Sequence, residues 1–109
     1  MNIYSYMEVG LFRLFFKAFS NKTRLNILAT LRKGPRNVTQ LCKTLRLEQS
    51  RVSHNLRCLQ QCGFVEVKPN GKERIYTIDE HNIAPLLNII DKHIDKYRER
   101  LKECRVVRP

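Results

Sequence analysis

A mainly α-helical chain with one β-hairpin, in the α+β class, is the fold that the sequence predicts. Apolar residues recur at three- and four-residue spacing through most of the 109 residues, a pattern typical of amphipathic helices. Between residues 64 and 78 the spacing changes to two, and the pair Asn70–Gly71 separates two β-branched and aromatic runs. The length corresponds to one domain, which we expect to cover residues 1–109.

Four helices are expected before the hairpin. Asn37, followed three residues later by Gln40, matches a capping box and predicts the start of a short third helix. The second helix is expected to stop at Gly34, because glycine followed by proline is typical of a helix end. The expected extents are residues 9–19, a second helix after the capping residues Ser20 and Asn21 and through Leu31, a third through Leu45, and a fourth over roughly 49–61.

Two strands and a further helix follow. Residues 64–68 and 73–78 are the expected strands, joined through Pro69-Asn70-Gly71. Residues 82–103 carry a narrow apolar stripe and are expected to be helical. This order is that of a winged helix-turn-helix with an additional C-terminal helix, in which residues 64–78 form the wing.

The first and last helical regions, about residues 9–32 and 82–103, have apolar faces with little of their own domain to cover them. Packing against a second copy of the chain would bury these faces. We therefore expect them to be dimerisation helices of a homodimer with two-fold symmetry, which also matches palindromic DNA operators.

The charge of the chain favours a polyanionic partner. Twenty-one Lys and Arg residues against ten Asp and Glu give a net charge of +11, and ten of the cations lie between Arg32 and Arg74. Double-stranded DNA is the first candidate and a membrane surface the second. No apolar run is long enough to span a bilayer, and the N-terminal pattern differs from a secretory signal, so we expect a cytoplasmic protein.

The fourth helix separates a core face from a polar face. Val52, Leu56 and Leu59 fall on one side, and hydrogen-bonding and cationic side chains cluster on the opposite half. A polar face is often merely solvated, but this one belongs to the second helix of a helix-turn-helix in a basic chain. The candidate DNA-contacting residues are Gln49, Ser50, Arg51, Ser53, His54 and Arg57 on this helix, and Lys68, Lys72 and Arg74 in the wing.

The cysteines suggest an effector site. Cys58 and Cys62 are four residues apart, on a flank of the fourth helix away from its core centre. Two thiolates at this spacing suit a soft ion such as cadmium, lead, zinc or copper(I). Cys104, at the end of the last helix, is a third candidate ligand, from the same chain or from the partner. Nearby Arg51 and Arg57 are expected to favour thiolate over thiol.

Other readings of the cysteines remain open. In a reducing cytosol all four are expected as free thiols, and any one of them could be a small buried hydrophobic residue, an explanation that suits Cys42 better than the pair on the fourth helix. Cys104 could also form a reversible crosslink with Cys58 or Cys62, which would make the protein sensitive to thiol oxidation or persulfides. The sequence contains no catalytic triad, phosphate loop or open catalytic metal motif. We therefore expect no enzyme, no organic cofactor and no small-molecule substrate.

Residues 21–31 and 38–78 resemble the ArsR/SmtB family of metal- and stress-responsive repressors. The likeness extends over about residues 10–100, and its most specific part is the frame formed by Ser50, Ser53, Leu56, Leu59 and Gly63. The resemblance implies a dimeric winged-helix protein that occupies its operator without an effector and releases it when an effector binds.

Within that family the chain is most similar to the cadmium- and lead-sensing CmtR branch. Residues 50–63 match its Ser-x-Val-Ser-x-x-Leu-x-Cys-Leu-x-x-Cys-Gly pattern, and Cys104 has nearly the spacing of its third cysteine. The resemblance therefore implies Cys58, Cys62 and Cys104 as ligands of Cd(II), Pb(II) or Zn(II). Two other family sites match poorly: residues 37–39 lack the paired cysteines of a third-helix site, and of the last-helix zinc pattern only His93 fits. A winged-helix protein without an effector remains a further alternative.

Overall fold

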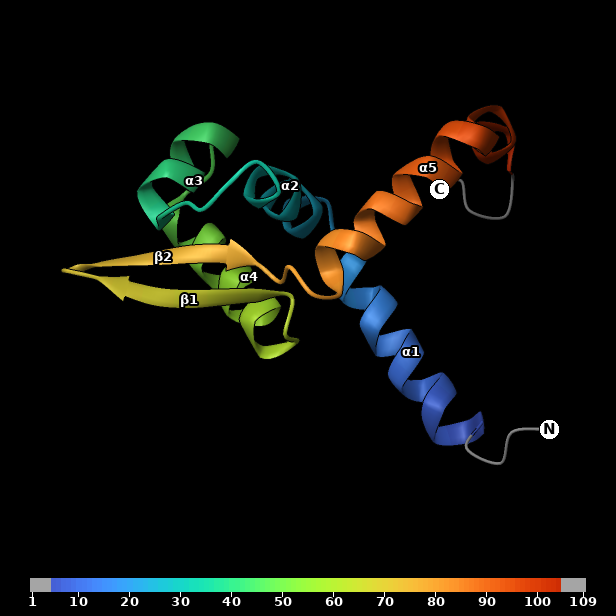
Figure 1. Ribbon diagram of the computed structural model, residues 1–109, viewed down its shortest axis with the longest axis horizontal. Helices are drawn as coiled ribbons and strands as arrows, with labels where there is room; N and C mark the ends of the chain where they lie inside the picture. The colour runs from blue at the N-terminus through green and yellow to red at the C-terminus, as the bar shows by residue number, and fades with distance from the viewer. Residues whose placement is uncertain (1–4, 105–109) are drawn as a thin grey trace. The chain divides into compact units, whose positions relative to one another are not determined.

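The predicted fold class is confirmed by the structure, a computed structural model that describes residues 5–104 (Figure 1). Contacts divide the chain into two compact units, one ending at Asp79 and the other beginning at Glu80. The first unit contains helices α1 (Ser5–Phe19), α2 (Lys22–Leu31), α3 (Val38–Leu45) and α4 (Gln49–Gln61) and strands β1 (Val65–Asn70) and β2 (Glu73–Ile78). The second contains α5 (Ile83–Glu103). None of the helices in the described part of the chain is long and apolar enough to cross a membrane.

Local capping explains where α2 and α3 begin. The Asn21 side chain accepts a hydrogen bond from the backbone N–H of Arg24 at 2.9 Å. At α3 the predicted capping box is present: Asn37 Oδ1 accepts from the Gln40 N–H at 2.8 Å, and Gln40 Oε1 accepts from the Asn37 N–H at 2.9 Å. Each interaction satisfies backbone donors that the first helical turn leaves free.

A tight turn at Arg46 leads from α3 into α4. Arg46 adopts the left-handed conformation, with φ 57° and ψ 48°, and the carbonyl of Cys42 accepts from the backbone N–H of Leu47 at 3.2 Å. This arrangement ends α3 and orients α4 as the second helix of the helix-turn-helix.

The core of the first unit lies where α2, α3, α4 and β1 meet. Val52, Leu56 and Leu59 are fully buried, which confirms the predicted core face of α4. Phe64 connects this core to α1, because its ring centroid lies 5.0 Å from that of Phe15 and 4.7 Å from that of Phe19. The largest fully buried side chains are Phe64, Ile27, Leu28, Leu41, Leu56, Leu59 and Val52.

The hairpin turns one residue later than a turn at Asn70–Gly71 would require. Asn70 pairs with Glu73, so the loop consists of Gly71 and Lys72, and Pro69 and Asn70 belong to β1. The predicted joining segment was therefore wrong in detail. Gly71 has φ +67°, as the first position of a type II′ turn requires, and a proline is tolerated in β1 because an edge strand does not need every N–H.

The second unit departs from an unbroken helix at one residue. Tyr97 has non-helical dihedrals, φ −115° and ψ 24°, inside α5. Its ring lies 4.8 Å from the His93 ring, and the Arg100 guanidinium lies 5.1 Å from its centroid. Along the predicted apolar stripe, Ile83 and Leu87 are buried and Leu101 is exposed. The stripe is thus buried at its start, and it is already exposed at Ile94, before the kink.

Candidate nucleic-acid interface and thiol pair

The polar half of α4 is presented to solvent. Ser53 is half-buried, and the other predicted contact residues of the helix, Gln49, Ser50, Arg51, His54 and Arg57, are exposed. Glu48, the residue before the helix, makes no side-chain cap, so the first backbone N–H groups of α4 have no capping side chain. Free N–H groups at the start of a helix, together with adjacent cations, can bind a phosphate. The remaining polar side chains of the helix can form hydrogen bonds with base edges.

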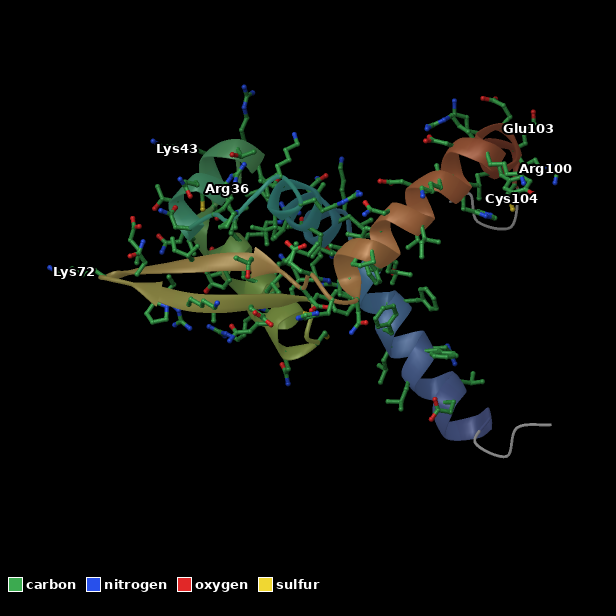
Figure 2. The ribbon with its side chains drawn as sticks, viewed as in Figure 1. Arg36, Lys43, Lys72, Arg100, Glu103 and Cys104 are labelled. Carbon is green, nitrogen blue, oxygen red and sulfur yellow. The ribbon has the colours of Figure 1, made fainter. Side chains whose placement is uncertain are left out.

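The three predicted wing residues are also exposed. Lys68 lies on β1 and Arg74 on β2, and Figure 2 shows Lys72 at the tip of the hairpin. Glu73 is the acidic residue nearest the tip, and its carboxylate binds α3 rather than the wing cations: Oε1 accepts a hydrogen bond from Nδ2 of Asn37, the N-cap of α3, at 3.2 Å. The tip therefore carries cations that can reach a phosphate backbone or a minor groove.

Two cations near α3 have different roles. The Arg36 guanidinium donates to the carbonyls of Gly34 and Pro35, each at 2.9 Å, and its backbone bridges Tyr76 of β2. Arg36 thus joins the α2–α3 link to the wing. Lys43 is exposed on α3 (Figure 2) and is a further candidate phosphate contact that the sequence argument missed. Its position on the first helix of the motif, which crosses the DNA backbone, could have indicated it.

Cys58 and Cys62 form a pair on another flank of α4. Cys58 is half-buried, Cys62 is exposed, and their side chains share a hydrogen bond. Partial burial raises the pKa of the Cys62 thiol above its ordinary value, and the neighbouring Cys58 raises it further through charge and hydrogen bonding. The nearby charge of Arg24 acts in the opposite direction and lowers the pKa. The expectation that Arg51 and Arg57 favour the thiolate was wrong for Cys62, because the cation that acts on it belongs to α2.

This pKa predicts slow alkylation of Cys62 in the metal-free protein. Only the thiolate reacts, so at neutral pH the rate should be below that of a cysteine in an unstructured peptide, and should keep rising through higher pH. Cys58→Ser removes a charge and a hydrogen bond that raise the pKa, so it should accelerate the reaction. The measurement is mass spectrometry of iodoacetamide labelling over a pH series, with Cys42→Ser as the control. Neutral-pH labelling as fast as in the peptide would contradict the prediction.

The third predicted ligand belongs to the other unit. Cys104 is half-buried at the C-terminal end of α5, close to Arg100 and Glu103 (Figure 2). Among residues 5–104 no group of three or more His, Cys, Asp and Glu side chains is assembled that could hold a metal ion. Within the first unit the structure brings Cys58 and Cys62 together, and Cys104 belongs to the second unit.

Arg24 and Asn55 form a polar junction beneath α4 that the sequence argument missed. Arg24 Nη1 donates to Asn55 Oδ1 at 3.2 Å, and Asn55 Nδ2 donates to the carbonyl of Arg51 at 2.9 Å. The guanidinium also donates to two carbonyls at the end of α1, to Ala18 through Nε at 2.7 Å and to Lys17 through Nη2 at 3.2 Å. A buried asparagine inside a recognition helix was the available signal, because a buried amide requires partners.

Known proteins agree with this architecture. The family model described as bacterial regulatory protein, arsR family, matches residues 21–67. Rv0081 of Mycobacterium tuberculosis, an HTH-type transcriptional regulator, is 34% identical over 79 residues, 72% of this chain and 69% of that protein. Its crystal structure superimposes with a TM-score of 0.82, covering 88% of this chain and 97% of that one. The chain belongs to the arsR family.

Other arsR-family relatives are similar over the same region. The regulator NmtR of M. tuberculosis is 39% identical over 72 residues, 66% of this chain and 60% of that one. A probable mercury resistance operon repressor of Streptomyces lividans is 33% identical over 73 residues, 67% and 58%. CmtR of Mycobacterium bovis is 34% identical over 71 residues, 65% and 60%. The chain thus spans about three-fifths of the length of these three relatives.

One solved relative bears on assembly. The homodimeric winged helix-turn-helix domain Mb0332 of M. bovis has a TM-score of 0.76 at 27% identity, over 88% of this chain and 92% of that one. The family consists of DNA-binding transcriptional regulators and not of enzymes, which agrees with the expectation from the sequence. Winged-helix architecture was likewise predicted and is confirmed.

Proposed function

We propose that this arsR-family chain is a homodimeric repressor that binds a DNA operator through α4 and the wing and releases it when a thiophilic ion binds. The exposed polar face of α4 would enter the major groove, and the cations of the wing would contact the backbone beside it. The charge of +11 supports this assignment, because each neutralised phosphate adds to salt-dependent affinity.

Adjacent thiols at Cys58 and Cys62 are the observation that supports an ion as effector. Their side chains share a hydrogen bond, on a flank of α4 that differs from the side carrying Ser53 and Arg57. Soft divalent ions, Cd(II), Pb(II) or Zn(II), bind thiolates strongly and displace their protons. Cys104, of the same chain or of the partner, would be the third ligand. The name of the mercury-resistance relative and the likeness to CmtR are consistent with this proposal.

The raised pKa of Cys62 disfavours oxidation that starts at this thiol. A thiol that stays protonated at neutral pH is a poor nucleophile towards oxidants and persulfides, whereas a thiophilic ion displaces the proton directly. A thiol-redox repressor that crosslinks Cys104 to Cys58 or Cys62 is therefore the second candidate. Mass spectrometry after mild oxidation distinguishes them, because only the redox repressor shows a reversible crosslink that accompanies loss of DNA.

Homodimer formation would bury the surface of α1. Five large apolar side chains of this helix, each 53–64% exposed, have no cover within the described chain: Val9, Leu11, Phe12, Leu14 and Phe16. Apolar exposure on this scale marks an interaction surface. A second copy is the proposed occupant, as in the homodimeric Mb0332, and the two α4 helices would then read successive half-sites.

The test is DNA affinity with and without Cd²⁺, Pb²⁺ or Zn²⁺. The probe is a duplex that the metal-free wild-type protein enriches from a randomised library, called here the selected duplex. We expect at least one ion to weaken binding by about tenfold or more, within the usual range of allosteric coupling. Cys58→Ser should bind the duplex normally and ignore the ion, whereas the control Cys42→Ser should respond like wild type. Wild-type affinity that is indifferent to all three ions would remove the proposal, and no preference for any duplex would favour a DNA-packaging protein.

A further inference from the structure

We propose that Arg24 is the positioning residue that transmits ion binding at Cys58 and Cys62 to the DNA-reading helix, through its hydrogen bond to Asn55 and its bonds to the end of α1. This inference rests on the proposed function, since it names the regulation of that site. Arg24, Asn55, Cys58 and Cys62 all belong to the first unit, in which α2 packs against both α1 and α4.

The guanidinium of Arg24 joins three helices. Arg24 lies on α2, two of its nitrogens donate to carbonyls in the last turn of α1, and the third donates to Asn55 on α4. Asn55 is only 6% exposed, and its amide in turn donates to the backbone of α4 at Arg51. A buried amide holds its partner firmly, because losing one hydrogen bond leaves a desolvated polar group. The junction therefore restricts how α4 can tilt against α1 and α2.

The thiol pair lies on the same side of α4 as this junction. Asn55, Cys58 and Cys62 are three and four residues apart, so they follow one another along a single face of the helix. Arg24 reaches this side of α4 through its bond to Asn55, and its charge lowers the pKa of the Cys62 thiol. Its bonded partners are all neutral: within the described residues no carboxylate pairs with this guanidinium.

Negative charge that develops at the thiols when an ion binds would therefore compete with Asn55 and the α1 carbonyls for the Arg24 guanidinium. A divalent ion held by Cys58, Cys62 and a third thiolate leaves one net negative charge on this flank of α4. That charge attracts the half-buried Arg24 guanidinium, which lacks an anionic partner. Because the guanidinium is planar, turning it towards sulfur loosens its hydrogen bonds to Asn55 and to the carbonyls of Lys17 and Ala18. Loosening these bonds frees α4 to tilt relative to α1. In a dimer such a tilt changes the spacing between the two reading helices, which must match two half-sites.

Two variants test this role, and a third variant serves as the matched control. Arg24→Lys keeps the charge and loses the fork. Asn55→Leu keeps the branched shape of the buried side chain and loses the acceptor. Arg46→Lys makes the same arginine-to-lysine change at the exposed α3–α4 turn. For each protein we would measure Cd²⁺ affinity from the thiolate-to-metal absorbance band, and affinity for the selected duplex without and with Cd²⁺. Thermal melting verifies that each variant folds. If Arg24→Lys does not fold, the result for Asn55→Leu decides whether the junction has this role.

In the wild type and in Arg46→Lys, Cd²⁺ should weaken DNA binding by about tenfold or more. Arg24→Lys and Asn55→Leu should bind Cd²⁺ within about threefold of wild type and yet change their DNA affinity by less than about threefold when it binds. A purely structural role for the junction would not separate ion affinity from the DNA response in this way. Wild-type coupling in both variants would overturn the role of Arg24 and leave the proposed function intact. A wild-type protein that binds Cd²⁺ without any DNA response would overturn both.

Discussion

Phe64→Ala should lower the free energy of unfolding by about 3–5 kcal/mol, the range for removing a buried aromatic ring. Phe64 is 1% exposed, and its ring packs on Phe15 and Phe19 at centroid distances of 5.0 and 4.7 Å. Truncation leaves a cavity and also removes the aromatic contacts that hold α1 to the core. Urea denaturation followed by circular dichroism measures the change, at one fixed protein concentration because a dimer makes stability concentration-dependent.

Leu25→Ala is the matched control for this effect. Leu25 lies on α2 and is 43% exposed, so its truncation removes apolar atoms without opening a cavity. Its effect should stay within about 1 kcal/mol. If Phe64→Ala cost no more than Leu25→Ala, Phe64 would not be the side chain that attaches α1 to the core.

Most of the fold was predictable because its determinants are local. The capping box of Asn37 and Gln40 and the apolar phase of α4 are short-range patterns, and both are confirmed. The exact position of the hairpin loop was not predictable, because the position of an Asn-Gly turn depends on strand register. Register here depends on distant contacts, including the bridge between Arg36 and Tyr76 and the bond from Asn37 to Glu73.

The candidate site divides in the same way. Which side chains of α4 face solvent follows from helical phase, so the exposed DNA-contacting candidates could be predicted. The charge that acts on the thiols, that of Arg24, could not be predicted. Arg24 and Asn55 are 31 residues apart in the sequence and meet only because α2 packs on α4. Arg51 and Arg57 are nearer to the cysteines in sequence and were therefore preferred. Proximity along the chain was misleading, because the polar face that carries Arg57 differs from the flank that carries the thiols.

The double variant Phe12→Glu/Phe16→Glu should convert the protein to a monomer and weaken binding to the selected duplex by about a hundredfold or more. The two rings lie one turn apart on α1 and are 61% and 59% exposed. In the proposed dimer they are buried, and two carboxylates without cationic partners in an apolar interface are strongly unfavourable. Loss of the dimer removes the second half-site contact, which in the intact protein is made at a high effective concentration.

Sedimentation equilibrium would measure the assembly, and titration of the selected duplex would measure affinity. Arg13→Glu is the matched control, because it places the same new side chain on α1 at an exposed position that is already polar. The control should remain dimeric, and circular dichroism should show native helix content in both proteins. A double variant that stays dimeric would exclude this face of α1 from the interface. A monomer that binds the duplex as tightly as wild type would instead show that one α4 helix is sufficient, and that reading of two half-sites is not how the protein recognises DNA.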